Sequence, residues 1–199
     1  MHAEKNDSTF REQKIMAKVP SPKNIPLCID LDGTLIQEDV TQIAVWRYLK
    51  HNPLRGVTVL LWLLRGRALL KKKLGERVEI DVSGLSYNPK VTALIRDAKL
   101  KGHSVVLATA ADARIAHKIA HYCGFFDHII ASDGFLNQRA AQKAETLIKT
   151  YGEKNFIYVG NSKDDLKVWQ HAHRAVAVNV SCSVARKLKN LSVFSEILS

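Results

Sequence analysis

Residues 25–35 read IPLCIDLDGTL, and the rest of the chain is interpreted outward from this stretch. The apolar run at 25–29 ends at a charged residue, which indicates a buried strand of a parallel sheet. Asp30 and Asp32 follow two residues apart, so both carboxylates point the same way, and Gly33 permits a tight turn. Two carboxylates this close repel unless a cation or a proton lies between them. The stretch therefore predicts a metal site or a nucleophile beside a proton donor; the plain alternative is a loop with two surface aspartates.

Apolar runs alternate with helical segments along the rest of the chain. The expected strands cover residues 104–108, 127–131, 156–159 and 175–178, and the expected helices cover 88–101, 111–122, 140–151 and 164–172. This alternation predicts an α/β fold, a Rossmann-like open parallel sheet with helices on both faces. Ligands of such sheets bind beyond the carboxyl ends of the strands, so functional residues are expected just after Ile29, Ala108 and Val159.

A second acidic loop, GNSKDD at residues 160–165, follows the expected strand that ends at Val159. Oxygen ligands such as Asn161, Asp164 and Asp165 suit Mg2+, which is a hard cation. The alternative is helix capping, with the acids in the first turn of the next helix. Both interpretations are compatible with this loop.

Two further positions are candidates for binding phosphate. Thr109 and Ala110 follow a strand and precede a helix, where a hydroxyl and backbone N–H groups can hold a phosphate oxygen; the alternative is an ordinary N-cap. Lys143 lies early in the helix expected at 140–151, and a lysine in such a place is usually solvated.

The order of these motifs is more specific than any one of them. The strand followed by DLDGT at 30–34, a helical insertion, Thr109, Lys143 and G-x-x-x-x-D at 160–165 resembles the haloacid dehalogenase-like (HAD) superfamily across about residues 25–180. Segments 61–67, 108–112 and 160–162 are similar to the HAD-like domain that precedes membrane prenyltransferases, although no prenyltransferase part lies in these 199 residues.

The resemblance implies a catalytic role for each matching position. Asp30 would attack phosphorus to give an aspartyl-phosphate, and Asp32 would protonate the leaving oxygen and then deprotonate the attacking water. Thr109, with the backbone of Ala110, would hold a phosphate oxygen. Lys143 would neutralise the charge of Asp30 and the phosphoryl group. The spacing of this lysine motif is loose, so Arg139 and Lys149 are alternatives to Lys143.

The resemblance also implies bound Mg2+, held by Asp30, the backbone carbonyl of Asp32, Asp165 and Asn161. The fourth motif of the superfamily usually opens with Gly-Asp, whereas this chain has Asn161 after the glycine. Losing one anion weakens the attraction for Mg2+ but keeps an oxygen ligand. We expect a working site with weaker metal affinity; a catalytically retired site is the alternative.

The predicted organisation has three parts. Residues 1–24 form a polar leader, residues 25–38 with 88–199 form the α/β core, and residues 39–87 form a helical cap over the site. A cap of this kind excludes water and selects the leaving group. The cap aromatics Trp46, Tyr48 and Trp62 either contact an apolar leaving group or, as the favoured alternative, form the small core of the cap.

The chain carries a net charge of +11, which favours anionic partners. A basic cluster in the cap, predicted to contact anionic lipid or a phosphorylated protein, comprises Arg65, Arg67, Lys71, Lys72 and Lys73. A solvated face is the alternative for the same residues. Nucleic acid is a less suitable partner, because exposed aromatics are not interleaved with the basic residues.

Composition narrows the functional class further. Hydrophobic residues make up 46% of the chain, which excludes a wholly disordered protein. No apolar run reaches the length of a membrane span and no signal peptide is recognisable, so a cytosolic protein, or one peripheral on a membrane face, is expected. The predicted function is a Mg2+-dependent phosphomonoester hydrolase, with phosphotyrosine in proteins as the first substrate. A phosphoinositide, a sugar phosphate, or a retired domain that binds an anionic membrane are the alternatives.

Overall fold

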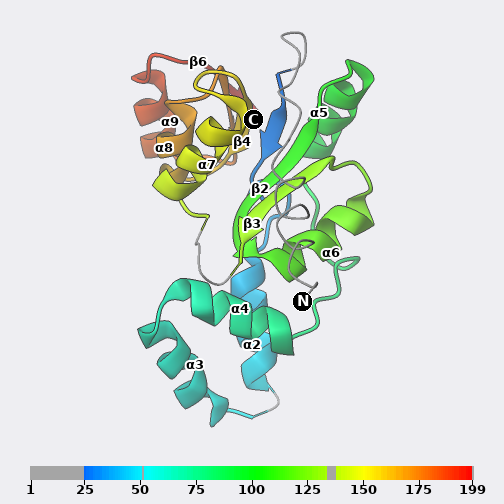
Figure 1. Cartoon of the computed structure of the whole chain (residues 1–199), viewed down its shortest axis with the longest axis vertical. Coiled ribbons are helices and arrows are strands. Elements are labelled where there is room, and N and C mark those ends of the chain that lie inside the picture. Colours follow the sequence, from blue (N-terminus) through cyan, green and yellow to red (C-terminus); the bar gives the residue numbers. More distant parts are fainter. Residues whose placement is uncertain (1–24, 51, 134–137, 199) are drawn as a thin grey trace, which may run out of the picture.

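A computed structural model of the chain describes residues 25–50, 52–133 and 138–198. The predicted polar leader at 1–24 lies outside the described residues. The rest forms an α/β core with three helices at one end of the sheet (Figure 1).

The core is built on a six-stranded sheet in which all neighbouring strands are parallel, in the order β3-β2-β1-β4-β5-β6. The strands are β1 (Leu27–Ile29), β2 (Val105–Asp112), β3 (His128–Ser132), β4 (Ile157–Gly160), β5 (Arg174–Val178) and β6 (Phe194–Leu198). The core helices are α5 (Pro89–Leu100), α6 (Ala113–Cys123), α7 (Ala141–Tyr151), α8 (Leu166–Trp169), which follows the 3-10 turn η1 (Lys163–Asp165), and α9 (Cys182–Lys189). The predicted fold class is confirmed.

Alternating side chains of the sheet pack on two helical layers. Leu27 and Ile29 of β1 belong to a cluster with residues of α5 and α6. Cys28, between them, belongs to a second cluster with residues of α7, α8 and α9. Both faces of the sheet are therefore covered, which explains why the strands read as continuous apolar runs.

The register of β1 positions the carboxylates. Ile29 is aligned with Leu107 of β2 on one side and with Val159 of β4 on the other. Asp30 therefore follows the last residue of the central strand, beside the end of β4, whereas β2 continues past this point. This is the edge at which open parallel sheets bind their ligands.

The structure differs from the predicted elements at three places. Strand β2 continues to Asp112, whose side chain accepts a hydrogen bond from the Arg114 N–H, so the next helix begins at Ala113. The helix expected at 164–172 is the short turn η1 followed by the four residues of α8. Strand β6 was not predicted, because its residues FSEIL lie at the sheet edge and lack a continuous apolar run.

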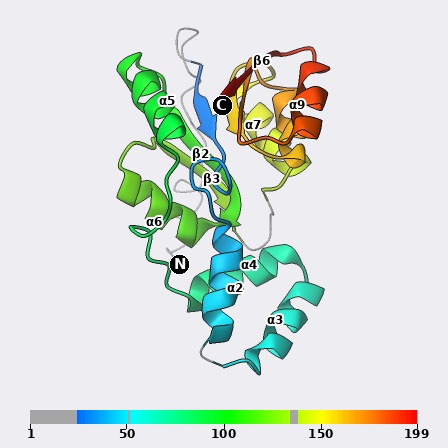
Figure 2. The same ribbon diagram turned by 180° about the vertical axis from the view of Figure 1, so that it is seen from behind.

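Three helices lie within the segment predicted as a cap, and they are called the cap helices: α2 (Val40–Lys50), α3 (Arg55–Leu64) and α4 (Arg67–Arg77). Helix α4 lies against β2 and α6, whereas α3 lies at the end of the cap farthest from the sheet (Figures 1 and 2). A Cβ on Gly75 of α4 would lie 2.3 Å from Oδ1 of Asp112, so glycine allows this close approach. The described residues include no helix with the length and apolar character that crossing a bilayer requires.

Candidate active site

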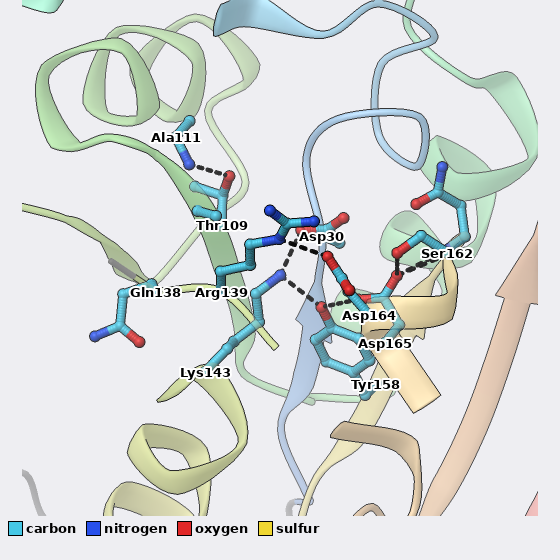
Figure 3. Close-up of polar contacts among 12 residues, drawn as sticks. Asp30, Thr109, Ala111, Gln138, Arg139, Lys143, Tyr158, Ser162, Asp164 and Asp165 are labelled. Atoms are coloured by element: carbon cyan, nitrogen blue, oxygen red, sulfur yellow. Dashed lines mark hydrogen bonds and ion pairs between the residues drawn. The ribbon is translucent and has the colours of Figure 1, made fainter. Parts of the chain in front are cut away.

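A cavity of about 410 Å³ lies where the carboxyl edge of the sheet meets the cap. Its core wall includes Asp30, Asp32, Ala110, Arg139, Lys143, Asn161, Ser162, Asp164 and Asp165. Its cap wall includes Leu63, Arg67, Leu70 and Lys71. Most of the residues predicted for catalysis therefore line one cavity, and Figure 3 shows the polar contacts among them.

A buried ion pair joins the first strand to α7. The Lys143 Nζ donates to Asp30 Oδ1 at 2.6 Å and to the Tyr158 hydroxyl at 2.8 Å (Figure 3). Burial by itself would lower the pKa of Lys143, but attraction by Asp30 and Asp165 raises it above its usual value. The amine therefore stays charged and can neutralise a second anion beside Asp30.

The pKa of the Asp30 carboxyl is raised to about 6. Burial has the largest effect, because it disfavours the charged form, and the charge of Asp165 acts in the same direction. The Lys143 charge opposes both effects. Asp30 is therefore an anion at pH 7, as a carboxylate nucleophile must be.

Asp32 lies at the junction between core and cap. Its Oδ1 accepts a hydrogen bond from the backbone N–H of Val40, the first residue of α2, at 2.8 Å. Burial raises the pKa of Asp32 to about 7, although this hydrogen bond opposes the shift. A carboxyl group with a pKa near 7 can both donate and accept a proton, which suits the role implied for Asp32.

Asp165 organises the loop after β4. Its Oδ2 accepts hydrogen bonds from the backbone N–H groups of Asn161 and Ser162 and from the Ser162 hydroxyl. Its Oδ1 accepts one from the hydroxyl of Tyr158. The capping geometry considered for this loop is therefore present, and it holds Asp165 in the cavity wall.

Tyr158 was missed by the sequence analysis. Its side chain is fully buried, and its hydroxyl bridges Lys143 and Asp165. Burial raises the pKa of Tyr158 well above its usual value, so the hydroxyl stays protonated. The only signal in the sequence is a hydroxyl group within a buried strand.

The turn after β1 and the loop after β4 meet at Gly33. This residue has φ +73°, and a Cβ there would lie 2.0 Å from Nδ2 of Asn161. Glycine is needed both for the positive φ and for the approach of the amide. Asn161 is therefore packed against the DLDGT turn.

The cavity offers oxygen donors of the kind that a hard cation binds, but few of these donors are charged. Within the described ranges, no cluster of three or more His, Cys, Asp or Glu side chains is placed to hold a metal ion. Asp30, Asp165 and the Asn161 amide line the same cavity, next to Asp32. Oxygen donors of this kind are the ones Mg2+ prefers. Both Asp165 oxygens already accept hydrogen bonds, so this carboxylate is less available than the sequence suggested.

Thr109 does not line the cavity, although it was predicted to hold phosphate. It is fully buried within β2, and its Oγ1 accepts a hydrogen bond from the Ala111 N–H (Figure 3). Because β2 continues to Asp112, the alternative of a helix N-cap at Thr109 is wrong. Ala110, the other residue predicted to hold phosphate, does line the cavity.

The structure distinguishes the three candidate cations of α7 and its flank. Lys143 contacts Asp30 directly. Arg139 lines the cavity, but its Nε pairs with Asp164 at 2.6 Å. Lys149 is exposed and pairs with Glu145, away from the cavity. Of the three, Lys143 is the cation that pairs with Asp30, and its role stays a prediction.

The basic cluster predicted as one surface is divided by the fold. Arg67 and Lys71 line the cavity, and Lys71 donates to the Ala110 carbonyl at 2.5 Å. Lys73 pairs with Glu76, and Arg65 is exposed at the end of α3. Helical periodicity separates these neighbours because adjacent residues point in different directions.

The cap aromatics do not line the cavity. Tyr48 and Trp62 pack on each other with ring centroids 5.3 Å apart, and Trp62 is buried inside the cap. Trp46 is exposed. The favoured alternative, that these rings form the cap's own core, holds for Tyr48 and Trp62. Apolar contact with a ligand is instead available from Leu63 and Leu70.

Solved structures show which fold class this architecture belongs to. A HAD family hydrolase from Salmonella enterica serovar Typhi superimposes with a TM-score of 0.62 at 14% identity, over 95% of this chain and 75% of that one. A phosphoserine phosphatase in apo form gives a TM-score of 0.60 at 17% identity, over 87% and 94%. A phospho-aspartyl intermediate analogue of phosphoserine phosphatase gives 0.57 at 15%, over 88% and 92%. The fold is that of the HAD-like hydrolases, which confirms the resemblance at the level of the fold.

Sequence comparison adds one relative. The uncharacterized protein y4nM of Sinorhizobium fredii is 32% identical over 188 residues, which are 94% of this chain and 36% of that protein. The chain thus spans about a third of the length of the curated relative it matches. No family model matches the sequence.

Proposed function

We propose that the protein is a Mg2+-dependent phosphomonoester hydrolase that acts through an aspartyl-phosphate. The observation that carries the proposal is the pairing of Asp30 with Lys143 at 2.6 Å in a cavity that Asp32 also lines. A carboxylate nucleophile, a fixed cation and a carboxyl group with a pKa of about 7 are the groups such a reaction needs. The HAD-like fold supports the same chemistry.

In the first step, an Asp30 oxygen attacks phosphorus and the bond from phosphorus to the leaving oxygen breaks. Asp32 gives its proton to that oxygen. In the second step, water attacks the phosphorus of the aspartyl-phosphate while Asp32 takes a proton from the water, and inorganic phosphate leaves with Asp30 restored. Lys143 neutralises the anions that meet at Asp30 throughout.

Asp30, the Asp32 carbonyl, Asn161 and Asp165 are the residues that would hold Mg2+. When bound, the metal supplies charge neutralisation and a fixed orientation for the phosphoryl oxygens. The amide of Asn161 replaces one anionic ligand, so a low affinity for the metal is part of the proposal.

The first test is hydrolysis of para-nitrophenyl phosphate with Mg2+ and with EDTA. Asp30→Asn is expected to lower the rate by at least about 1,000-fold, because an amide is a poor nucleophile. Asp97→Asn, at an exposed aspartate of α5 that pairs with Lys101, is the matched control and should retain full activity. Activity that survives in Asp30→Asn, or a folded chain without turnover at millimolar Mg2+, contradicts the proposal; the second result favours a retired site.

Phosphotyrosine remains the predicted substrate, but its structural support has changed. The cap aromatics expected to contact an aryl group lie elsewhere, and the cavity offers Leu63, Leu70, Arg67 and Lys71. Structural neighbours described as phosphoserine phosphatases favour a small phosphorylated molecule as the second candidate. Comparing kcat/KM for phosphotyrosine peptides, free phosphoserine, a sugar phosphate and an inositol phosphate separates these substrates. A preference for the peptides by less than tenfold would contradict the protein-substrate prediction.

A further inference from the structure

The outer helix of the cap, α3, is unusually apolar and exposed. Trp62 is its only buried residue. On its outer side, Leu54 at the N-cap is 81% exposed, Val57 65%, Leu61 53% and Leu64 75%. Large aliphatic side chains rarely gather on the surface of a protein unless they contact a partner or a membrane.

These four residues form one stripe, which is called the α3 stripe below. Their spacings of three, four and three residues place Leu54, Val57, Leu61 and Leu64 on the same side of a helix. The opposite side, with Val59 and Trp62, packs into the cap. In Figures 1 and 2, α3 lies at the end of the molecule away from the sheet, so no described element covers its outer side.

The charges around the α3 stripe are mostly positive. The segment predicted as the cap, residues 39–87, contains nine arginines and lysines and four carboxylates, Asp39, Glu76, Glu79 and Asp81. Arg55 begins α3 and Arg65 follows its last residue, and both are exposed. The helix itself contains no acidic residue. A negatively charged partner is therefore the electrostatic complement of this surface.

A groove of about 650 Å³ opens at the N-terminal end of α3. Its lining includes four cations, Arg47, Lys50, Arg55 and Arg77, and one carboxylate, Glu79. Trp46, which is 69% exposed, also borders this groove and a neighbouring one that reaches Gly56 of α3. An indole ring beside cations and aliphatic side chains is typical of surfaces that enter the headgroup region of a bilayer.

We propose that the α3 stripe docks on the surface of an anionic phospholipid bilayer. The four aliphatic side chains enter the boundary between headgroups and acyl chains, and Lys50, Arg55 and Arg65 bind the lipid phosphates around them. This location replaces the basic cluster predicted from the sequence, because Arg67 and Lys71 of that cluster line the active-site cavity. Leu63 of the same helix also lines the cavity, so docking would hold the cap wall of the cavity close to the lipid surface. The proposal does not depend on hydrolase activity.

The test is co-sedimentation of the full chain with vesicles of phosphatidylcholine, with and without about 30% phosphatidylglycerol. The wild-type chain should bind the anionic vesicles, and about 0.5 M salt should weaken binding without abolishing it, because the apolar contribution is not screened. Leu61→Glu/Leu64→Glu should lower the affinity by roughly tenfold or more. Arg65→Glu should lower it by roughly fivefold, on anionic vesicles only.

The matched control is Leu100→Glu, the same change at a leucine of α5 that is 89% exposed and lies outside the cap. It should bind vesicles like the wild-type chain. Circular dichroism and hydrolysis of a soluble phosphate ester check that each variant is folded, since none of the changed residues lines the active-site cavity. A wild-type chain that does not bind anionic vesicles overturns the proposal. An equal loss in Leu100→Glu, or a dimer in solution that the double substitution dissociates, also overturns it; the dimer would assign the stripe to a second copy of the chain.

Discussion

In most proteins charged side chains are exposed and large aliphatic side chains are buried. The carboxyl edge of the sheet departs from the first tendency, and the outer helix of the cap departs from the second. At the sheet edge, charged side chains are buried: Lys143 is 4% exposed and Asp165 is 3% exposed. In α3, large aliphatic side chains are exposed. Buried charge and exposed apolar surface are each costly unless something compensates them.

The two regions differ in where the compensation comes from. At the sheet edge the compensation comes from within the chain, because Lys143 pairs with Asp30 and Asp165 accepts a hydrogen bond from the neutral hydroxyl of Tyr158. The aliphatic side chains of α3 have no such partner among the described elements on their outer side, so we assign their compensation to a bilayer.

Removing the buried cation should destabilise the fold strongly. Lys143→Met is expected to lower the free energy of unfolding by about 4 kcal/mol at pH 8, because Asp30 is left as a buried anion without its partner. Lys149→Met, in the same helix, removes an exposed pair with Glu145 and should cost less than about 0.5 kcal/mol. Urea denaturation measures both. Adding Asp30→Asn to Lys143→Met should recover much of the lost free energy of unfolding, because no buried anion is then left unpaired. Equal losses in Lys143→Met and Lys149→Met would show that the pair of Lys143 with Asp30 is no more important than an exposed pair.

The contact between the two site loops can be separated from backbone strain. Gly33 and Gly124 have nearly equal φ angles, +73° and +71°, but a Cβ meets Asn161 only at Gly33, and nothing within 4 Å at Gly124. Gly33→Ala should therefore cost about 2.5 kcal/mol and Gly124→Ala about 1 kcal/mol. Thermal or urea denaturation measures the difference. If contact with Asn161 causes the larger cost at Gly33, then Gly33→Ala made in an Asn161→Ala chain should cost no more than Gly124→Ala. A cost that stays larger in the Asn161→Ala chain would show that backbone strain alone is responsible.

Neutralising Asp32 should stabilise the protein in a pH-dependent way. The folded-state pKa of Asp32, about 7, lies above its unfolded value, so its contribution to stability is complete below the unfolded pKa and is lost as the pH rises through 7. Asp32→Asn avoids that loss and should be more stable than the wild-type chain by about 2 kcal/mol at pH 8, a figure reduced for partial solvent screening. The advantage should shrink toward pH 5. Denaturation in EDTA across this range measures it, and a constant difference would contradict the assignment.

The smallest effects distinguish the two sides of the cap. Gly75→Ala in α4 places a Cβ against Asp112 and should cost about 1 kcal/mol, although alanine normally favours a helix. Gly56→Ala in α3 meets nothing within 4 Å and should gain about 0.5 kcal/mol. Chemical denaturation of both variants measures the contrast. A gain at both positions would mean that α4 is not held closely against the core.

The sequence was sufficient for the fold class because the signals that define it are local. The alternation of apolar runs with helical segments predicted five of the six strands, and the DLDGT turn indicated the edge at which the site forms. The unpredicted strand, β6, is held by pairing with β5 rather than by an apolar pattern of its own. The end of β2 was misjudged because small residues at 108–111 suit a strand or a helix equally.

The residues that come just after a strand end line the cavity where the sequence placed them, although their roles stay predictions: Asp30, Asp32, Ala110 and Asn161. Packing of separate elements determines which cation reaches Asp30, since Lys143 and Asp30 are 113 positions apart and the loose spacing of the motif left Arg139 and Lys149 as alternatives to Lys143. Packing also determines that Thr109 is buried and does not line the cavity, that Tyr158 bridges two charged residues, and that the aliphatic side of α3 is exposed. The physical reason is the same in each case: spacing along the chain determines the direction of a side chain within its own element, whereas its partners depend on how separate elements pack.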